Sequence, residues 1–131
     1  MCLLLKKTVH KFPLPDNNGV LSGAISKNKE LVVLSNTNTL LFNNQGEQLQ
    51  KLSNERAFAV AISSDNTLVA ILRDTSCVDI VGIEGALLCR LPLKGKQNGS
   101  MSGYSIEFID DTTLLVGYTC GAVELKIEDV V

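Results

Sequence analysis

A pattern of two short apolar segments separated by a polar turn occurs three times in this chain. Residues 24–34 (AISKNKELVVL) and residues 61–71 (AISSDNTLVAI) match at a spacing of 37 positions. Residues 106–116 (IEFIDDTTLLV) repeat the pattern and begin 46 positions after Val60. The segments are too short for helices and are bounded by Asn, Asp, Gly and Ser, which is typical of strands and turns. The chain is therefore built from copies of a strand-rich unit near 40 residues.

A strand unit of this length cannot bury its own faces, so it must stack on neighbouring copies. This period is typical of the blades of a β-propeller. A basic residue followed by an apolar one also recurs, with the apolar residue at Phe12, Leu52 and Leu91, and we expect these positions at the ends of outer strands. The predicted fold class is all-β, made of β-propeller blades that are four-stranded antiparallel sheets.

The phase of the repeat predicts one domain over residues 1–131. It assigns residues 1–14 to the end of a blade, 20–52 and 57–93 to two blades, and 103–131 to an incomplete blade. Closed propellers have about 4 to 8 blades, so we expect an incomplete propeller or a fragment of one. Three arrangements are open: a fragment of a longer propeller protein, a subunit that completes the ring with another chain, and an open stack of sheets.

Three unbroken apolar runs predict strands that are buried on both faces, because a strand with one face in water alternates between apolar and polar residues. These runs are Leu31–Leu34, Leu68–Ile71 and Leu114–Val116. We expect each to be a central strand of its sheet.

Composition and charge exclude several classes of partner. The formal net charge is -2, so no basic footprint for nucleic acid is present. Lys94 and Lys96 beside Arg90 are interpreted as a solvated rim. No segment approaches the ~20 apolar residues that cross a bilayer, so no membrane span is expected. No secretory signal is recognisable, and a cytoplasmic location is predicted.

The residue types that carry catalysis or bind metals are sparse. The four cysteines form no Cys-x-x-Cys pair and the only histidine is His10, so we expect reduced thiols, no metal site and no cofactor. Asp110-Asp111 align with Ser64-Asp65 and Lys27-Asn28 of the other copies. This alignment predicts turn residues rather than paired catalytic carboxylates, and we expect that the chain is not an enzyme. The cysteines are Cys2, Cys77, Cys89 and Cys120.

Two segments carry a resemblance to a known family. Residues 60–70 (VAISSDNTLVA) resemble the opening of a WD-repeat blade, and residues 121–125 (GAVEL) resemble its third strand. The chain departs from that family because it has no tryptophan, because Val81-Gly82 stands where the Trp-Asp pair would be, and because no Gly-His pair precedes a first strand. It is similar to a divergent WD-repeat-like β-propeller of about three blades, over roughly residues 20–131.

The resemblance implies a non-catalytic protein-interaction scaffold, part of a larger protein or assembly, which binds other proteins through loops on one face. Arg56, Arg73 and Tyr118 are the large side chains of those loops, and Arg and Tyr are enriched among interface hot spots. They are the candidate protein-binding residues. The loops are expected at residues 13–19, 35–38, 53–56, 73–76, 92–101 and 118–120.

Two other functions remain open. One is a structural subunit that completes a propeller with another chain, as a homo-oligomer or by pairing with a further propeller segment. Unpaired strands and apolar sheet faces at both ends of the stack favour this, and Met1–Leu14 is expected to add beside Ala122–Ile127. The other is a portion of a propeller enzyme. The first strands, which line the channel, argue against it because Glu107 is their only charge.

Overall fold

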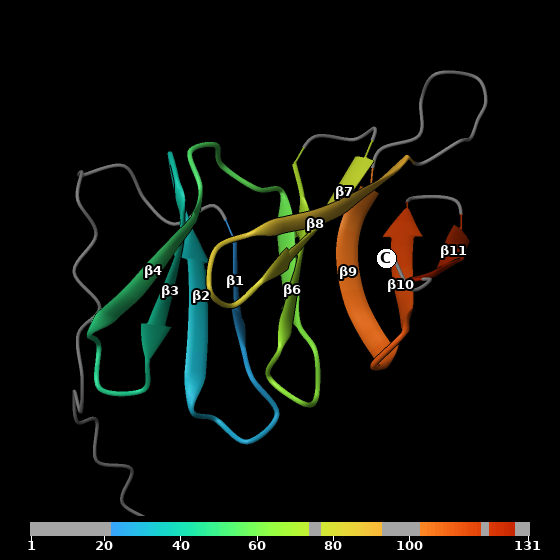
Figure 1. The fold of residues 1–131 in the computed structure, drawn as a ribbon. Helices are drawn as coiled ribbons and strands as arrows, with labels where there is room; N and C mark the ends of the chain where they lie inside the picture. Colours follow the sequence, from blue (N-terminus) through green and yellow to red (C-terminus); the bar gives the residue numbers. More distant parts are fainter. Residues whose placement is uncertain (1–21, 74–76, 93–102, 119–120, 128–131) are drawn as a thin grey trace, which may run out of the picture.

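The computed structural model describes residues 22–73, 77–92, 103–118 and 121–127, and every regular element within these ranges is a β-strand (Figure 1). The predicted blade end at residues 1–14 lies outside the described residues. Within them, no helix is long and apolar enough to span a membrane. The all-β fold class is confirmed.

The strands form three antiparallel sheets, and each strand pairs with the next one along the chain. The first and second sheets have four described strands each, and the third has three. The first sheet contains β1 (Ser22–Ile25), β2 (Leu31–Ser35), β3 (Thr39–Asn43) and β4 (Gln48–Ser53); the second contains β5 (Ala59–Ile62), β6 (Leu68–Leu72), β7 (Cys77–Gly82) and β8 (Leu87–Pro92); the third contains β9 (Gly103–Asp110), β10 (Thr113–Tyr118) and β11 (Gly121–Lys126).

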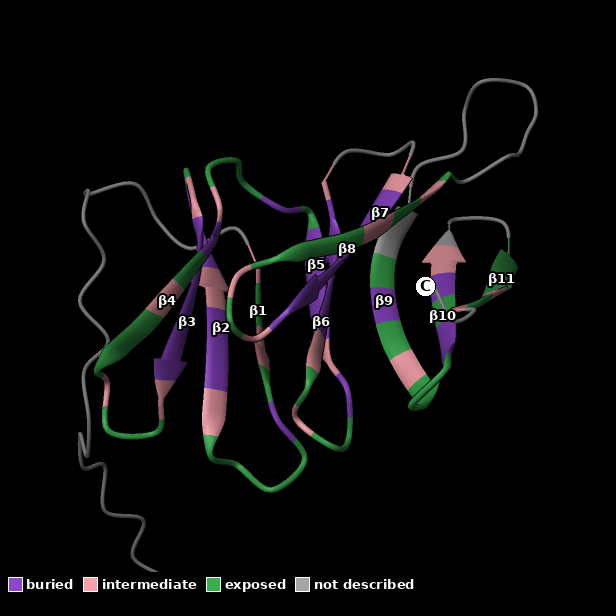
Figure 2. Ribbon diagram, in the orientation of Figure 1, coloured by how far each residue is buried: buried purple, intermediate pink, exposed green. Residues whose placement is uncertain are grey.

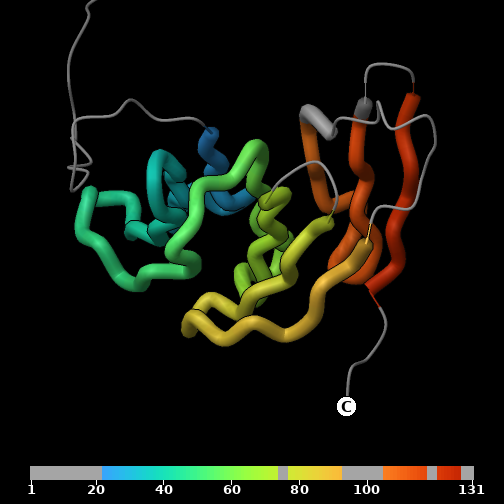
Figure 3. The backbone as a smooth tube through the Cα atoms, turned by 90° about the horizontal axis from the view of Figure 1, so that it is seen from above, coloured from blue at the N-terminus to red at the C-terminus, as the bar shows by residue number. Residues whose placement is uncertain are grey.

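The three sheets lie side by side in chain order (Figure 3). Their first strands are neighbours, because β5 contacts both β1 and β9. The side chains of β6 alternate between two cores, as the two-residue period of a strand requires. Val69 belongs to a cluster with Val33 and Leu41 of the first sheet, whereas Ala70 belongs to a cluster with Leu114 of the third sheet. The second sheet is therefore buried from both sides.

The predicted burial of the apolar runs holds for two strands and fails for the third. β2 and β6 carry buried residues on both faces (Figure 2). In β10, Leu114 and Val116 are fully buried, but Leu115 between them is 36% exposed. The prediction for Leu114–Val116 is wrong on one face, because only the second sheet packs against the described part of the third sheet.

The third sheet also corrects the alignment of the repeats. In the second sheet Ile62 pairs with Val69, whereas in the third sheet Phe108 pairs with Leu114. Leu114 therefore occupies the place of Val69 and not that of Leu68, because the connection between the first two strands is one residue shorter. A shift of one residue moves every side chain of a strand to the opposite face. It leaves Leu115 on the face away from the second sheet.

The turns between first and second strands share a hydrogen-bonding device. Asp65 accepts hydrogen bonds from both the N–H and the hydroxyl of Thr67, at 3.1 and 2.7 Å. Asp110 accepts the same pair from Thr112, at 2.9 and 3.1 Å. Asp111 is a turn residue, as predicted, whereas Asp110 is the last residue of β9 and bonds to the turn with its side chain. Asp110 rather than Asp111 is the equivalent of Asp65.

Hydrogen bonds to these aspartates favour the ionised carboxylate. Bonds from Thr67 and Ser63 lower the pKa of Asp65, and the backbone N–H of Thr112 lowers the pKa of Asp110. The first sheet uses Asn28 at this place, where it accepts from Glu30 N–H at 3.1 Å. A neutral amide can therefore build the same turn.

The outer faces of the first and third sheets differ. On the first sheet, Val32, Leu40 and Phe42 form a separate buried cluster. On the third sheet, Leu115 pairs with Glu107 on one side and Glu124 on the other, which gives a row of two exposed carboxylates around a partly exposed leucine. The open end predicted at residues 1–14 lies outside the described residues. On the third sheet the apolar surface is interrupted by charge.

Candidate protein-binding site at the loop end of the sheets

The antiparallel order brings one set of connections to one end of the three sheets, which we call the loop end. β2, β4 and β6 finish at this end, and β3, β5 and β7 begin there. The β10–β11 connection lies at the equivalent end of the third sheet. Of the loops that the sequence assigns to one face, residues 35–38 and 53–56 lie at this end, whereas residues 13–19, 74–76, 93–101 and 119–120 lie outside the described residues.

Buried polar side chains hold the β4–β5 connection at this end. The backbone N–H of Ala57 donates to Ser35 Oγ at 2.7 Å, and Thr39 Oγ1 donates to the carbonyl of Glu55 at 2.9 Å. Ser35 and Thr39 are fully buried and their hydroxyl oxygens lie 3.2 Å apart. Ser22 Oγ also donates to the Ala57 carbonyl, at 2.9 Å. The connection is therefore tied to β1, β2 and β3.

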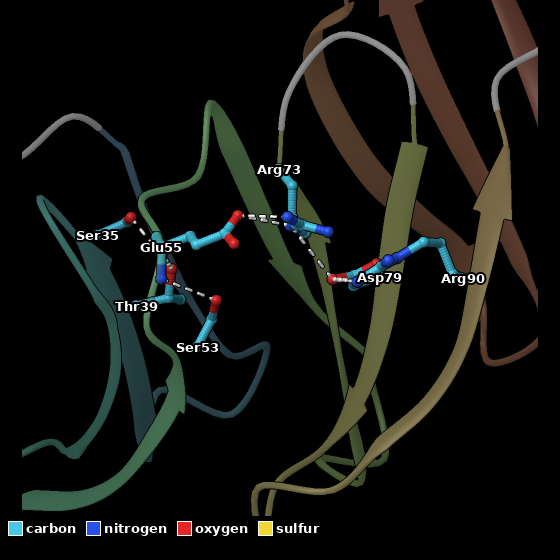
Figure 4. A network of polar contacts seen from close by, with 7 residues as sticks. All are labelled: Ser35, Thr39, Ser53, Glu55, Arg73, Asp79 and Arg90. Atoms are coloured by element: carbon cyan, nitrogen blue, oxygen red, sulfur yellow. Dashed lines mark hydrogen bonds and ion pairs between the residues drawn. The ribbon is translucent and has the colours of Figure 1, made fainter.

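Four charged side chains continue from this connection into the second sheet (Figure 4). We call Glu55, Arg73, Asp79 and Arg90 the charged network. Arg73 donates to Glu55 from Nε at 2.9 Å and also from Nη2, and its Nε lies 3.6 Å from Asp79 Oδ2. Arg90 donates to both oxygens of Asp79, from Nε at 2.7 Å and from Nη2 at 3.2 Å. The side chain of Asp79 is only 8% exposed.

The charged network compensates a buried carboxylate. An unpaired buried charge is costly, and two guanidinium groups meet the carboxylate of Asp79. The hydrogen bond with Glu55 raises the pKa of Arg73, and the hydrogen bond with Asp79 raises the pKa of Arg90. Arginine keeps its proton in proteins, and both pKa directions favour the charged guanidinium.

A groove of about 430 Å³ opens beside the charged network. Leu52 and Val81 are its buried apolar residues, and Leu87 of β8 is an exposed one. All four residues of the charged network line it. The groove thus lies between the outer strand of the first sheet and the second sheet, and it combines a small apolar surface with paired charges.

The three predicted binding residues lie in different parts of the fold, and their role in binding stays a prediction. Arg56 is exposed in the β4–β5 connection. Arg73 is engaged in the charged network. Tyr118 is the last residue of β10, in the third sheet, and its side chain lies outside the described residues. The only aromatic side chain in the β4–β5 connection is Phe58, which is 40% exposed and which the sequence reasoning did not select.

The sequence reasoning also missed Glu55, Asp79 and Arg90 as a unit. The available signal was the single carboxylate of Asp79 within the apolar run Cys77–Val81. Arg90 is its cross-strand partner in the sheet register. Arg90 is exposed, as the interpretation of a solvated rim residue expects, and its guanidinium also binds the buried carboxylate of Asp79. Lys94 and Lys96 lie outside the described residues.

The first strands enclose a second hollow, of about 340 Å³. Its lining is mostly apolar, with Ile25 and Ile109 among its exposed side chains. Glu107 is the charged residue predicted there, and Lys27 and Asp110 are further charges in the lining. Among the residues that the structure describes, no group of three or more His, Cys, Asp or Glu side chains is placed to hold a metal ion.

Among the described residues, Cys77 and Cys89 form no disulfide, and both are partly buried. Cys89 packs at the edge of the core between the second and third sheets, and its burial raises the pKa of its thiol. Cys2 and Cys120 lie outside the described residues. The partial burial of Cys77 and Cys89 suits the packing of a small apolar side chain, and their reduced state stays a prediction.

Comparisons with known proteins identify the fold. No family model and no curated protein matches this chain. Among solved structures, the C-terminal WD40 domain of Sif2 superposes with a TM-score of 0.66 at 21% identity, over 93% of this chain and 35% of that one. Hsv2 of Kluyvelomyces marxianus gives 0.65 at 17% identity, over 77% of this chain and 37% of its own.

A KlHsv2 variant, in which loop 6CD is replaced by a Gly-Ser linker, gives a TM-score of 0.70 at 17% identity, over 88% of this chain and 42% of that one. This chain thus spans about two fifths or less of the length of the structures it matches. Three stacked antiparallel sheets with this meander order agree with the same architecture. The chain has the fold of a partial, divergent WD40-like β-propeller.

Proposed function

We propose that this chain is a non-catalytic protein-interaction scaffold of the WD-like propeller type, part of a larger protein or assembly, and that it binds its partner with the loop end. The observation that carries the proposal is the β4–β5 connection. Its backbone is held by Ser22, Ser35 and Thr39, while Arg56 and Phe58 stay exposed.

A loop that is ordered before binding loses less conformational entropy when a partner docks. Arginine and aromatic side chains are enriched at protein interfaces. The β4–β5 connection combines both properties. Arg73 has a different role in the free chain: its guanidinium holds Glu55 and contacts Asp79, so it supports the connection.

The test is affinity capture with quantitative mass spectrometry on two double variants. Arg56→Ala with Phe58→Ala removes one cation and one exposed apolar side chain from the loop end. Lys51→Ala with Leu49→Ala removes the same types from β4, where both side chains are exposed and Leu49 is 50% exposed. We expect the first variant to lose specific partners at least tenfold and the second to keep them.

Both variants should keep the far-ultraviolet circular dichroism and melting temperature of the parent, because the substituted side chains are exposed. Equal recovery of the same partners by the parent and by the Arg56/Phe58 variant would reject the loop end as the binding face. Loss of partners by the Lys51/Leu49 variant alone would move the binding face to β4.

A second candidate function is a structural subunit that completes a propeller with another chain. The observation that favours it is the outer face of the third sheet, where Leu115 is 36% exposed. Light scattering across a concentration series separates the two candidates. A stoichiometric assembly that Leu115→Glu dissociates, and that Leu87→Glu on β8 leaves intact, would favour the subunit. A monomer that captures partners through Arg56 and Phe58 would favour the scaffold.

A further inference from the structure

The three repeated sheets allow the residue at the position of Asp79 to be compared between sheets. Asp79 pairs with Ile71 in the second sheet. The same register position holds Leu40 in the first sheet, opposite Leu34, and Val123 in the third sheet, opposite Val116. This fold therefore accepts apolar side chains at the position, and a buried ion pair is seldom more stabilising than apolar residues of similar size. The packing of the sheet does not require the charges of Asp79 and its two arginines.

The four members of the charged network differ in how firmly they are held. Asp79, at 8% side-chain exposure, lies between two guanidinium groups and its strand is in the middle of the sheet. Glu55 has a side-chain exposure of 58% and comes from the β4–β5 connection rather than from the second sheet. Glu55 is thus the member that can return to water. Its departure would leave two guanidinium groups and one carboxylate, with a net charge of +1, on the wall of the groove.

We propose that this groove binds a carboxylate side chain from an acidic peptide segment of a partner protein, and that Glu55 occupies the place of that carboxylate in the free chain. The inference rests on the proposed scaffold function and names the kind of segment that the loop end takes. Guanidinium groups recognise carboxylates through paired N–H donors in a fixed plane. Arg73 supplies this group at the floor, and Arg90, whose side chain is 50% exposed, supplies it at the rim.

The apolar part of the groove specifies the neighbour of the acidic residue. Leu52 and Val81 lie in its lining, and Leu87 is 53% exposed beside them. An apolar side chain next to the incoming carboxylate would cover Leu87. The exchange leaves no buried charge without a partner, because Asp79 keeps Arg90 and the incoming carboxylate takes the place of Glu55 on Arg73.

The probe for the test is a fluorescein-labelled, end-blocked peptide with a central Leu-Glu-Leu sequence in a Ser-Gly background, measured by fluorescence anisotropy. Glu55→Gln removes the competing charge and should tighten binding at least fivefold. Glu84→Gln removes an exposed carboxylate from the neighbouring β7–β8 turn and should change the Kd less than twofold. A peptide with Gln in place of its Glu should bind at least tenfold more weakly.

A second variant, Arg73→Lys with Asp79→Leu and Arg90→Lys, removes both guanidinium groups while it keeps their positive charges and the fold. Asp79→Leu with Arg90→Lys copies the pair Leu40 and Lys51, which occupies the equivalent cross-strand position of the first sheet. We expect this variant to fold and to lose peptide binding, although its net charge is more positive by one unit. Loss of binding in a folded variant therefore reports the guanidinium site and not the overall charge.

Three results would overturn the proposal. The first is equal effects of Glu55→Gln and Glu84→Gln. The second is retention of peptide binding by the Arg73→Lys/Asp79→Leu/Arg90→Lys variant. The third is competition by inorganic phosphate as effective as competition by unlabelled peptide, which would show that the site selects for negative charge alone. Capture of partners through Arg56 and Phe58 is measured separately. Failure of the peptide with successful capture would reject this inference and leave the scaffold function standing.

Discussion

β6 and β10 are both unbroken apolar runs in the sequence and both are second strands of their sheets, yet their surroundings differ. β6 has a sheet on each side, and Val69, Ala70 and Ile71 are all buried. β10 packs against the second sheet with Leu114 and Val116, while Leu115 lies between two glutamates on the other face. An unbroken apolar run in the sequence therefore indicates that a strand is suited to burial on both faces. Whether both faces are buried depends on whether a neighbouring sheet packs on each side of the strand.

The largest expected effect compares one charge on the two strands. Val69→Asp places a carboxylate between the first and second sheets, where it has no partner, and should lower the free energy of unfolding by about 3 to 5 kcal/mol. Leu115→Asp places the same group on the exposed face and should cost about 1 kcal/mol or less. Urea denaturation measures both. Similar midpoints for the two variants would contradict the difference between the strands.

The next comparison tests the shortened turn of the third sheet. Leu114→Ala removes a fully buried side chain and should cost about 2 to 4 kcal/mol, whereas Leu115→Ala should cost less than about 1 kcal/mol. If the alignment of Leu115 with Val69 were correct, the order of the two costs would be reversed. Chemical denaturation of the two variants under one set of conditions decides between the registers.

A smaller effect is expected in the turn between β5 and β6. Ser63 Oγ accepts from the N–H of Leu68 at 3.0 Å, and Ser63 is fully buried. Ser63→Ala leaves that donor without its acceptor and should cost about 1 to 2 kcal/mol. Ser64→Ala, at an exposed position, should stay within about 0.5 kcal/mol. The β9–β10 turn forms without an equivalent serine. Equal costs for the two serine variants would show that the second sheet does not need the Ser63 hydroxyl either.

The smallest effect concerns pH. Because folding lowers the pKa of Asp65 and Asp110, their contribution to stability is complete above the unfolded value, about 3.9, and is lost as the pH falls through the lowered pKa. Asp65→Asn with Asp110→Asn keeps an acceptor of the kind that Asn28 supplies. The melting temperature of this variant should fall less than that of the parent between pH 6 and pH 2.5. Parallel curves would exclude these carboxylates as a source of acid sensitivity.

The sequence predicted the sheets because the strand period and the turn residues are local properties. Val60–Ala70 contains the whole signal for one hairpin, and its copies locate the others. The register of the third sheet was not predictable from the repeat pattern. One missing residue in the Ile109–Thr113 region hardly changes the pattern of apolar and polar residues, yet it moves each side chain of β10 to the opposite face of the sheet.

The charged network was not predicted: the sequence reasoning selected Arg73 only as a binding residue and Arg90 only as part of a solvated rim. Its members other than Arg73 come from three separate elements, β7, β8 and the β4–β5 connection. Asp79 and Arg90 lie eleven positions apart in the sequence, and only the β7–β8 register makes them partners. The exposed Phe58 was missed for a similar reason: it precedes the strand that begins at Ala59, and the apolar pattern alone assigns it to the core.

The two ends of the sheets differ in how far their connections can vary in length. At the end opposite the loop end, the first and second sheets use turns of identical length, closed by equivalent backbone bonds such as Lys29 N–H to the Ser26 carbonyl and Asn66 N–H to the Ser63 carbonyl. Lys29 and Asn66 both adopt positive φ angles, of 65° and 62°. At the loop end, strands are joined over different lengths, from residues 119–120 between β10 and β11 to residues 93–102 between β8 and β9.

Doubling the length of a flexible connection costs only about 0.6 kcal/mol in closure entropy. New segments can therefore be inserted at the loop end of such a chain without a change in the register of any sheet. The same insertion in a turn at the other end would disrupt backbone bonds that set the register. Evolution, or a protein engineer, can thus lengthen and diversify one end of this molecule while the other end preserves its architecture.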